Sequence, residues 1–245
     1  NSPEINKLKF LVISGMDQLA DQEHIKAKCP TQSSFFKSII LSQKPNSSVD
    51  TYSTYLKKFS NSNLSEYDAF FWTGGLGNIY EKNEFNSSQL KLAENLLNLN
   101  KPIWGSCWGL QVLVTVFGGK IIKSNKPEFG FSSNIKILNK HYIFENKLDC
   151  FTAPGHHYDV IEKMPIGFNV LAENNFSIQA ILSIDSNIVC TQYHPELPYD
   201  FIGKLMFYWK NNYLNLMTNK KFDNLIKQLN DLENKDTFLR KLELI

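Results

Sequence analysis

Apolar and polar residues follow two different rhythms along the first half of the chain. Short apolar runs of strand length alternate with longer segments whose apolar residues recur at helical spacing, as at positions 35, 36, 39 and 40. Glycine or proline closes several of these segments and so marks their ends. The pattern predicts strands at 8–14, 49–55, 68–73 and from 102 onward, helices at 33–42, 87–100 and 108–117, a loop with a short helix at 16–30, and a turn at 61–67.

The second half changes to short β-type runs and then ends in helical segments. Strands that alternate with helices predict an α/β fold with a doubly wound, mostly parallel sheet and helices on both faces. We expect one domain at 1–200 and a helical extension at 201–245 packed on the same domain. The predicted strands are 120–123, 134–138, 150–152, 168–172, 178–184 and 187–193, and the predicted terminal helices are 201–216, 221–233 and 236–243.

Composition narrows the class of protein. The chain has 245 residues and a net charge of +2, with no stripe of basic residues interleaved with aromatic ones, so we expect no nucleic-acid partner. The apolar run at 10–13 is far too short to span a membrane or act as a signal sequence. The four cysteines show no C-x-x-C spacing, which predicts a reduced, cytoplasmic protein without disulfides or a zinc site. The absence of an initiator Met indicates a trimmed or processed start.

A candidate nucleophile lies where the strand that starts at 102 meets the helix at 108–117. Gly105-Ser106-Cys107-Trp108-Gly109 has the G-x-C-x-G spacing of a sharp strand-to-helix turn, in which flanking glycines leave room for the turn. This turn would project the thiol of Cys107 into a cleft at a helix N-terminus, which favours the thiolate. A buried structural cysteine between two turn glycines remains the alternative.

Two further segments follow predicted strands. Three glycines in Gly74-Gly75-Leu76-Gly77 would let backbone N–H groups approach a ligand, although a flexible turn has the same composition. His194 and Glu196 are two residues apart, so in an extended segment they share a face, as a base and its orienting carboxylate would. A loop with a solvated Glu is the alternative. Because ligands bind beyond the carboxyl ends of parallel strands, we expect these segments and Cys107 to form one site.

Together these blocks, with Gln192-Tyr193 before His194, resemble the class I, triad-type glutamine amidotransferases in order and separation. The segments 155–160 and 171–173 are also similar to the family pattern, and the resemblance covers about residues 8–200. The resemblance is strongest to the stand-alone branch of the family, in which a helical tail follows a flavodoxin-like glutaminase fold.

The resemblance implies a role for each matching residue. Cys107 would attack the side-chain amide of glutamine or of a γ-glutamyl compound to form a thioester, His194 would transfer protons, and Glu196 would orient His194. No metal or organic cofactor is implied. The implied oxyanion hole consists of the backbone N–H groups of Gly75 and Trp108, and the implied substrate-binding residues are Gly77 and Gln111.

Several residues depart from the commonest family pattern. Leu76 replaces a proline, Trp108 replaces a smaller apolar residue, and His156 and Tyr158 replace Ser and Gly around His157. The bulk of Trp108 beside the nucleophile leaves the substrate open between free glutamine and another γ-glutamyl amide. The resemblance makes His157 a structural or substrate-proximal residue.

The sequence leaves several functions open. An amidotransferase of this length has no room for an ATP-dependent synthetase domain, so a partner synthetase would have to accept the ammonia. A γ-glutamyl hydrolase or peptidase would need no partner. A non-catalytic glutamyl-binding regulatory module and a different cysteine hydrolase are the remaining alternatives. The oligomeric state cannot be assigned from the sequence.

Overall fold

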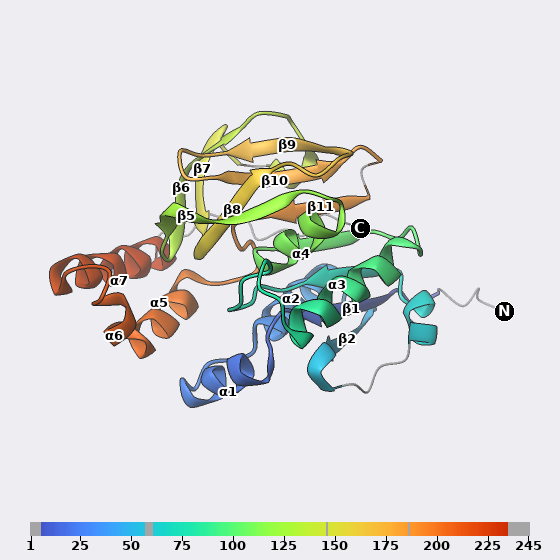
Figure 1. Ribbon diagram of the computed structural model, residues 1–245, viewed down its shortest axis with the longest axis horizontal. Coiled ribbons are helices and arrows are strands. Elements are labelled where there is room, and N and C mark those ends of the chain that lie inside the picture. Colours follow the sequence, from blue (N-terminus) through green and yellow to red (C-terminus); the bar gives the residue numbers. More distant parts are fainter. Residues whose placement is uncertain (1–5, 57–60, 146, 186, 235–245) are drawn as a thin grey trace.

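A nine-stranded mixed sheet forms the centre of the protein (Figure 1). The computed structural model describes residues 6–56, 61–145, 147–185 and 187–234. Five strands form the parallel half, in the order β2 (Ser48–Ser53), β1 (Lys9–Ser14), β3 (Ala69–Trp72), β4 (Ile103–Ser106) and β11 (Ile188–Thr191). The antiparallel half continues with β10 (Ile178–Ser183), β9 (Phe168–Glu173), β6 (Phe131–Ile137) and β7 (Cys150–Pro154).

Helices cover both faces of this sheet. On one face, α3 (Glu84–Leu97) and α4 (Trp108–Val116) bury their leucines and valines against β1, β3 and β4. On the other face, α2 (Gln32–Gln43) buries Phe36 and Ile40 against the same strands. Strands buried on both faces are apolar throughout, and all four residues of β3 are buried. The predicted α/β fold is confirmed.

The C-terminal helices form a third apolar cluster beside the sheet. They are α5 (Tyr199–Tyr208), α6 (Lys210–Tyr213) and α7 (Asn219–Asn234), and they bury Phe222 and Leu229. Phe129 and Phe131 pack on the same cluster, which joins the helices to the antiparallel half. The helix predicted at 236–243 lies outside the described residues, and the division at residue 200 stays a prediction.

The structure contains regular elements that the sequence pattern did not predict. The segment 157–163 forms β8 (His157–Lys163), which pairs with β5 (Lys120–Glu128) outside the large sheet. Its inward-facing positions include His157 and Asp159, so the usual apolar alternation is missing. By contrast, the short helix expected within the loop at 16–30 is present as α1 (Gln18–Lys26), whose N-cap Asp17 accepts a hydrogen bond from the Ala20 N–H.

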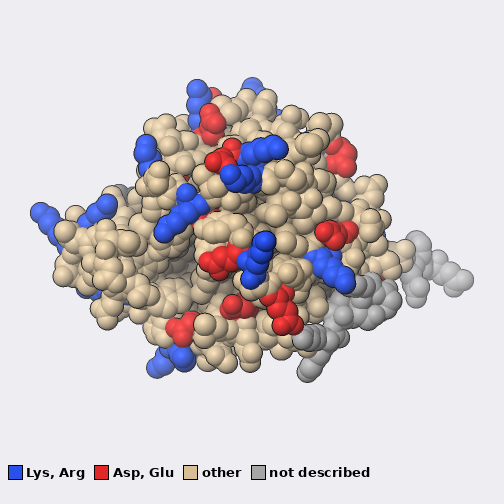
Figure 2. Space-filling view, in the orientation of Figure 1, with Lys and Arg blue, Asp and Glu red and all other residues tan. Residues whose placement is uncertain are grey.

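Charged residues of both signs are interspersed on the face shown in Figure 2. Among the described residues, no helix is both long enough and apolar enough to cross a membrane.

Candidate functional site

Cys107 occupies the sharp turn between β4 and α4. Its φ of 51° and ψ of −101° are unusual for a residue with a side chain, and such a conformation costs about 1–3 kcal/mol. The turn is held from the neighbouring strand, because the Cys107 N–H donates to the carbonyl of Thr191 at 2.8 Å. The thiol therefore lies at the start of a helix in a strained but anchored position, as the G-x-C-x-G spacing predicts.

The flanking glycines are needed because backbone segments cross closely on both sides of Cys107. A Cβ on Gly105 would lie 2.7 Å from the carbonyl carbon of Gly109. A Cβ on Gly109 would lie 2.8 Å from the backbone oxygen of Trp72 in β3. Neither neighbour can move aside as a flexible side chain could, so close packing of the strand and helix explains both glycines.

His194 and Glu196 follow β11 and are both buried. The Nδ1 atom of His194 lies 2.7 Å from Oε1 of Glu196. The other carboxylate oxygen, Oε2, accepts a hydrogen bond of 3.1 Å from the Ser106 hydroxyl, which itself accepts one of 3.0 Å from the Trp104 indole N–H. The carboxylate is thus fixed from both sides and points at the imidazole.

The electrostatic surroundings favour the charged form of His194. Burial lowers its pKa, but the negative charge of Glu196 and the hydrogen bond to Cys107 outweigh burial and raise the pKa to about 10. At neutral pH the ring is therefore protonated, with Glu196 on one side and the sulfur on the other. This arrangement holds a proton ready for a leaving group.

The glycine loop after β3 passes directly over the N-terminus of α4. A Cβ on Gly75 would lie 2.4 Å from the Gly15 carbonyl oxygen and 2.9 Å from Cγ of Trp108, so only glycine fits there. Trp108 is the first residue of α4, and N–H groups in the first turn of a helix have no partner within the helix. The structure thus brings Gly75 and Trp108 together beside Cys107.

The Trp108 side chain points into the core and does not line the cavity. Its indole N–H donates to Oε1 of Gln89 at 2.9 Å, and the Trp72 indole donates to the same oxygen at 2.8 Å. The ring lies under Gly75 and Gly77 and supports the glycine loop. The bulk of Trp108 therefore faces away from the substrate space and by itself gives no reason to prefer another γ-glutamyl amide over glutamine.

A cavity of about 250 Å³ opens at the carboxyl ends of the parallel strands. This volume approaches the size of small-molecule sites. Figure 2 shows the molecule hollowed between the lobe of C-terminal helices and the sheet. The cavity walls include five residues expected at the site, namely Cys107, His194, Gly75, Gly77 and Gln111.

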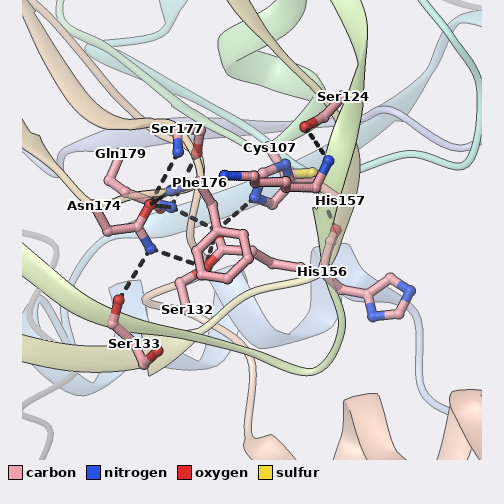
Figure 3. A network of polar contacts seen from close by, with 12 residues as sticks. Cys107, Ser124, Ser132, Ser133, His156, His157, Asn174, Phe176, Ser177 and Gln179 are labelled. Atoms are coloured by element: carbon pink, nitrogen blue, oxygen red, sulfur yellow. Dashed lines mark hydrogen bonds and ion pairs between the residues drawn. The ribbon is translucent and has the colours of Figure 1, made fainter.

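A buried polar network around Glu128 reaches the cavity wall at His157. His157 Nε2 lies 2.8 Å from Glu128 Oε1, and His157 Nδ1 lies 2.9 Å from the carbonyl oxygen of Asp159. Both ring nitrogens thus have an oxygen partner within hydrogen-bond distance, which fixes the orientation of the ring. Asn174 and Gln179 also donate to Glu128, at 2.9 Å and 2.6 Å. Figure 3 shows Asn174 and Gln179 gathered at this network.

His156 belongs to a different environment from His157, and Figure 3 shows its ring turned away from the network. Burial, together with the charges of His157 and His194, lowers its pKa to about 3. The neutral ring accepts a hydrogen bond of 3.1 Å from the Gly130 N–H and lies 2.8 Å from the Tyr213 hydroxyl. His156 thereby links the cavity wall to the C-terminal helices.

The sequence analysis did not identify several residues that shape the site. Ser106 lies inside the recognised motif but has no separate signal, and its partner Glu196 is 90 residues away. Glu128 is 29 residues from His157, and nothing in its local sequence marks it as buried. The same holds for Gln89 and Gln32, whereas Trp104 lies in the apolar strand predicted from 102 onward.

The sheet presents a cysteine turn, a histidine–carboxylate pair and a glycine loop at the ends of neighbouring parallel strands. This arrangement defines a general class of α/β proteins in which a cysteine occupies the sharp turn between a strand and a helix. The sequence model of the family described as "Glutamine amidotransferase class-I" matches residues 34–207. The chain belongs to this family.

Two curated relatives carry the name glutamine-hydrolysing GMP synthase. The one from Tropheryma whipplei (strain Twist) is 33% identical over 136 residues, which is 56% of this chain and 26% of the relative. The one from Thermosipho melanesiensis is 36% identical over 136 residues, which is 55% of this chain and 25% of the relative. The matched region therefore spans about a quarter of the length of these relatives.

A solved structure supports the assignment of the fold. A glutamine amidotransferase from Thermotoga maritima superposes with a TM-score of 0.68 at 20% identity, covering 93% of this chain and 92% of that one. At this identity the likeness establishes the fold alone.

Proposed function

We propose that this protein hydrolyses the γ-amide of glutamine or of a γ-glutamyl compound through a thioester on Cys107. The observation that carries the proposal is the convergence of Cys107, the His194–Glu196 pair and the glycine loop on one cavity. Membership in the class I glutamine amidotransferase family supports the same chemistry.

Acylation begins with the Cys107 thiolate and the protonated His194. The sulfur attacks the amide carbon, and the negative charge that develops on the oxygen is stabilised by the backbone N–H groups of Gly75 and Trp108. Removal of one such donor in other enzymes costs about 3–4 kcal/mol. The carbon–nitrogen bond then breaks as His194 gives its proton to the departing nitrogen, which leaves a thioester and neutral His194.

Deacylation uses the same residues in the opposite sense. Neutral His194 takes a proton from water, the hydroxide attacks the thioester carbon, and the carbon–sulfur bond breaks. Glutamate leaves, and the thiolate and protonated His194 are restored. Throughout the cycle Glu196 stabilises the charged imidazole and is itself held by Ser106.

The glutamyl part of the substrate would lie along Gly77 and Gln111 in the cavity wall. Asp159 lines the same cavity and accepts a hydrogen bond of 3.0 Å from the Tyr80 hydroxyl. Burial raises the pKa of its carboxyl, and the Tyr80 hydrogen bond opposes that effect. A carboxylate at this position suits the positively charged α-amino group of a glutamyl substrate.

A second candidate function is ammonia delivery to a partner synthetase. It is favoured by the names of the curated relatives, which are glutamine-hydrolysing GMP synthases. In this version the domain at 1–200 produces ammonia in the cytoplasm and a separate protein consumes it. A γ-glutamyl hydrolase would release the amine to water without a partner.

Release of ammonia or amine from glutamine and γ-glutamyl amides tests the proposal. We expect turnover by the wild type and none by Cys107→Ala. Cys150→Ala is the matched control, because Cys150 is an exposed free cysteine on β7 and should leave turnover unchanged. Equal turnover by wild type and Cys107→Ala would contradict the proposal. So would a complete lack of turnover with all substrates when Cys107 also resists a glutamine-like chloroketone.

A further inference from the structure

The cavity has a polar half and an apolar half. The polar half contains Cys107, the glycine loop and Gln111. The apolar half is formed by side chains of α5 and of the turn before it, namely Leu197, Phe201, Ile202, Leu205 and Met206. Leu197 follows Glu196 directly in the chain, so the apolar wall starts on the side of the cavity where His194 lies. A departing amine must lie on this side, because His194 is the group that protonates it.

A buried acceptor without a hydrogen-bond partner lies on the same side. Gln32, the first residue of α2, is only 7% exposed, and within the described part of the chain its Oε1 has no partner. A Cβ built on Gly74 would lie 2.8 Å from this oxygen, 2.7 Å from Cε1 of His194 and 3.4 Å from its Nε2. The oxygen and the acid therefore border one small space. Buried polar groups are almost always paired, so an unpaired oxygen at a cavity wall indicates a ligand that donates to it.

The orientation of the Gln32 amide is fixed by its other neighbours. His24 places Nδ1 2.8 Å from the carbonyl oxygen of Ala20, so Nδ1 must carry a hydrogen. Its Nε2 then accepts from the Gln32 amide nitrogen, which lies 3.4 Å away. Phe201 and Trp209 hold the His24 ring, with centroid distances of 6.2 Å and 6.3 Å. The amide nitrogen of Gln32 therefore donates to His24, away from the cavity, and Oε1 faces the cavity.

We propose that Gln32 and the apolar wall form a subsite for the departing amine, which makes γ-glutamyl amides of small apolar amines the preferred substrates. This inference rests on the proposed function. When the sulfur–carbon bond has formed and the carbon–nitrogen bond breaks, His194 protonates the nitrogen. Gln32 Oε1 accepts a hydrogen bond from the N–H of the departing amine. The carbon substituent of the amine lies against the apolar side chains of α5. Ammonia has no such substituent, so with glutamine as the substrate this apolar surface would stay uncovered.

A series of γ-glutamyl alkylamides tests the apolar wall. Methyl, propyl and isopentyl amides have leaving groups of similar basicity, so differences in kcat/KM report contact with the wall. Burial of each methylene contributes enough free energy for a several-fold gain, and we expect kcat/KM to rise from methyl to isopentyl by roughly tenfold or more. A flat or falling series, with glutamine the best substrate, would overturn the inferred preference.

A comparison of amides with esters tests Gln32. An ester has no N–H on its leaving group, so Gln32 Oε1 cannot accept a hydrogen bond from that group. We expect Gln32→Leu and Gln32→Met to lower kcat/KM for γ-glutamyl propylamide by roughly 10–100-fold. For the γ-glutamyl propyl ester, kcat/KM should stay within about twofold of the wild-type value. Gln22→Leu, at an exposed position of α1, is the matched control and should change kcat/KM for neither substrate.

The outcomes separate this subsite from the proposed function. Cys107-dependent ester hydrolysis shows that the thioester chemistry is intact in each variant and that the variant is folded. Equal losses for amide and ester would make Gln32 a structural residue and overturn the inference, and no loss for either would also overturn it. If the wild type cleaves neither substrate, the proposed function itself fails.

Discussion

Replacing Glu196 by Gln removes one charge from the site and nearly preserves its shape. The amide oxygen can still accept the hydrogen bond from His194 Nδ1, which is 2.7 Å long in the wild type. With charge centres roughly 4 Å apart and an effective dielectric constant of about 20, the lost attraction is about 4 kcal/mol. At about 1.4 kcal/mol per pH unit, this loss lowers the pKa of His194 by about 3 pH units.

The direction of the pH effect follows from the proposed role of His194 as the acid. In the wild type its pKa is raised to about 10, so the protonated ring persists through neutral pH and kcat/KM falls only in strongly alkaline solution. In Glu196→Gln we expect the alkaline limb to begin about 3 pH units lower and kcat/KM at its optimum to fall by roughly a thousandfold.

The assay is kcat/KM for an amide substrate across the alkaline range. Glu94→Gln, on the exposed surface of α3, is the matched control and should keep the wild-type profile. An unchanged alkaline limb in Glu196→Gln, with full activity, would refute the role of Glu196 and would favour a cysteine hydrolase whose orienting group lies elsewhere.

Three further substitutions test the supporting structure. Gly74→Ala places a Cβ 2.7 Å from His194 Cε1, so we expect a loss in kcat/KM of roughly a hundredfold, measured beside an unfolding curve that stays close to wild type. Gln89→Leu leaves two buried indole N–H groups without an acceptor, and urea titration should show a loss of about 2–6 kcal/mol in unfolding free energy. Trp108→Phe should lower the unfolding free energy by less. Glu128→Gln alters a buried side chain that His157, Asn174 and Gln179 contact, and should lower the unfolding free energy by roughly 1–3 kcal/mol.

The sequence predicts those parts of the site that depend on local patterns. Cys107, Gly75 and His194 each follow an apolar strand, and parallel strands bring their carboxyl ends to one edge of the sheet. That geometric rule is sufficient to place the three segments together. The G-x-C-x-G spacing also predicts the turn at Cys107, although the spacing alone leaves a buried structural cysteine as the alternative.

The remaining contacts depend on chain segments that have no local signal. The Ser106 hydroxyl meets a carboxylate 90 residues away, and the position of that pair depends on the register between β4 and β11. β8 was missed because its buried face is polar, with His157 turned toward Glu128. The Trp108 indole could not be oriented from sequence, since its direction depends on the buried Gln89.

Mass spectrometry of the acyl-enzyme tests the central claim most directly. The protein is mixed with a γ-glutamyl amide, quenched in acid and digested. We expect one γ-glutamyl group in thioester linkage on the Cys107 peptide and none on the peptides of Cys29, Cys150 or Cys190. In Cys107→Ala the modification should disappear. Amide hydrolysis without any acyl group on Cys107, or with the group on another cysteine, would contradict a thioester mechanism at Cys107.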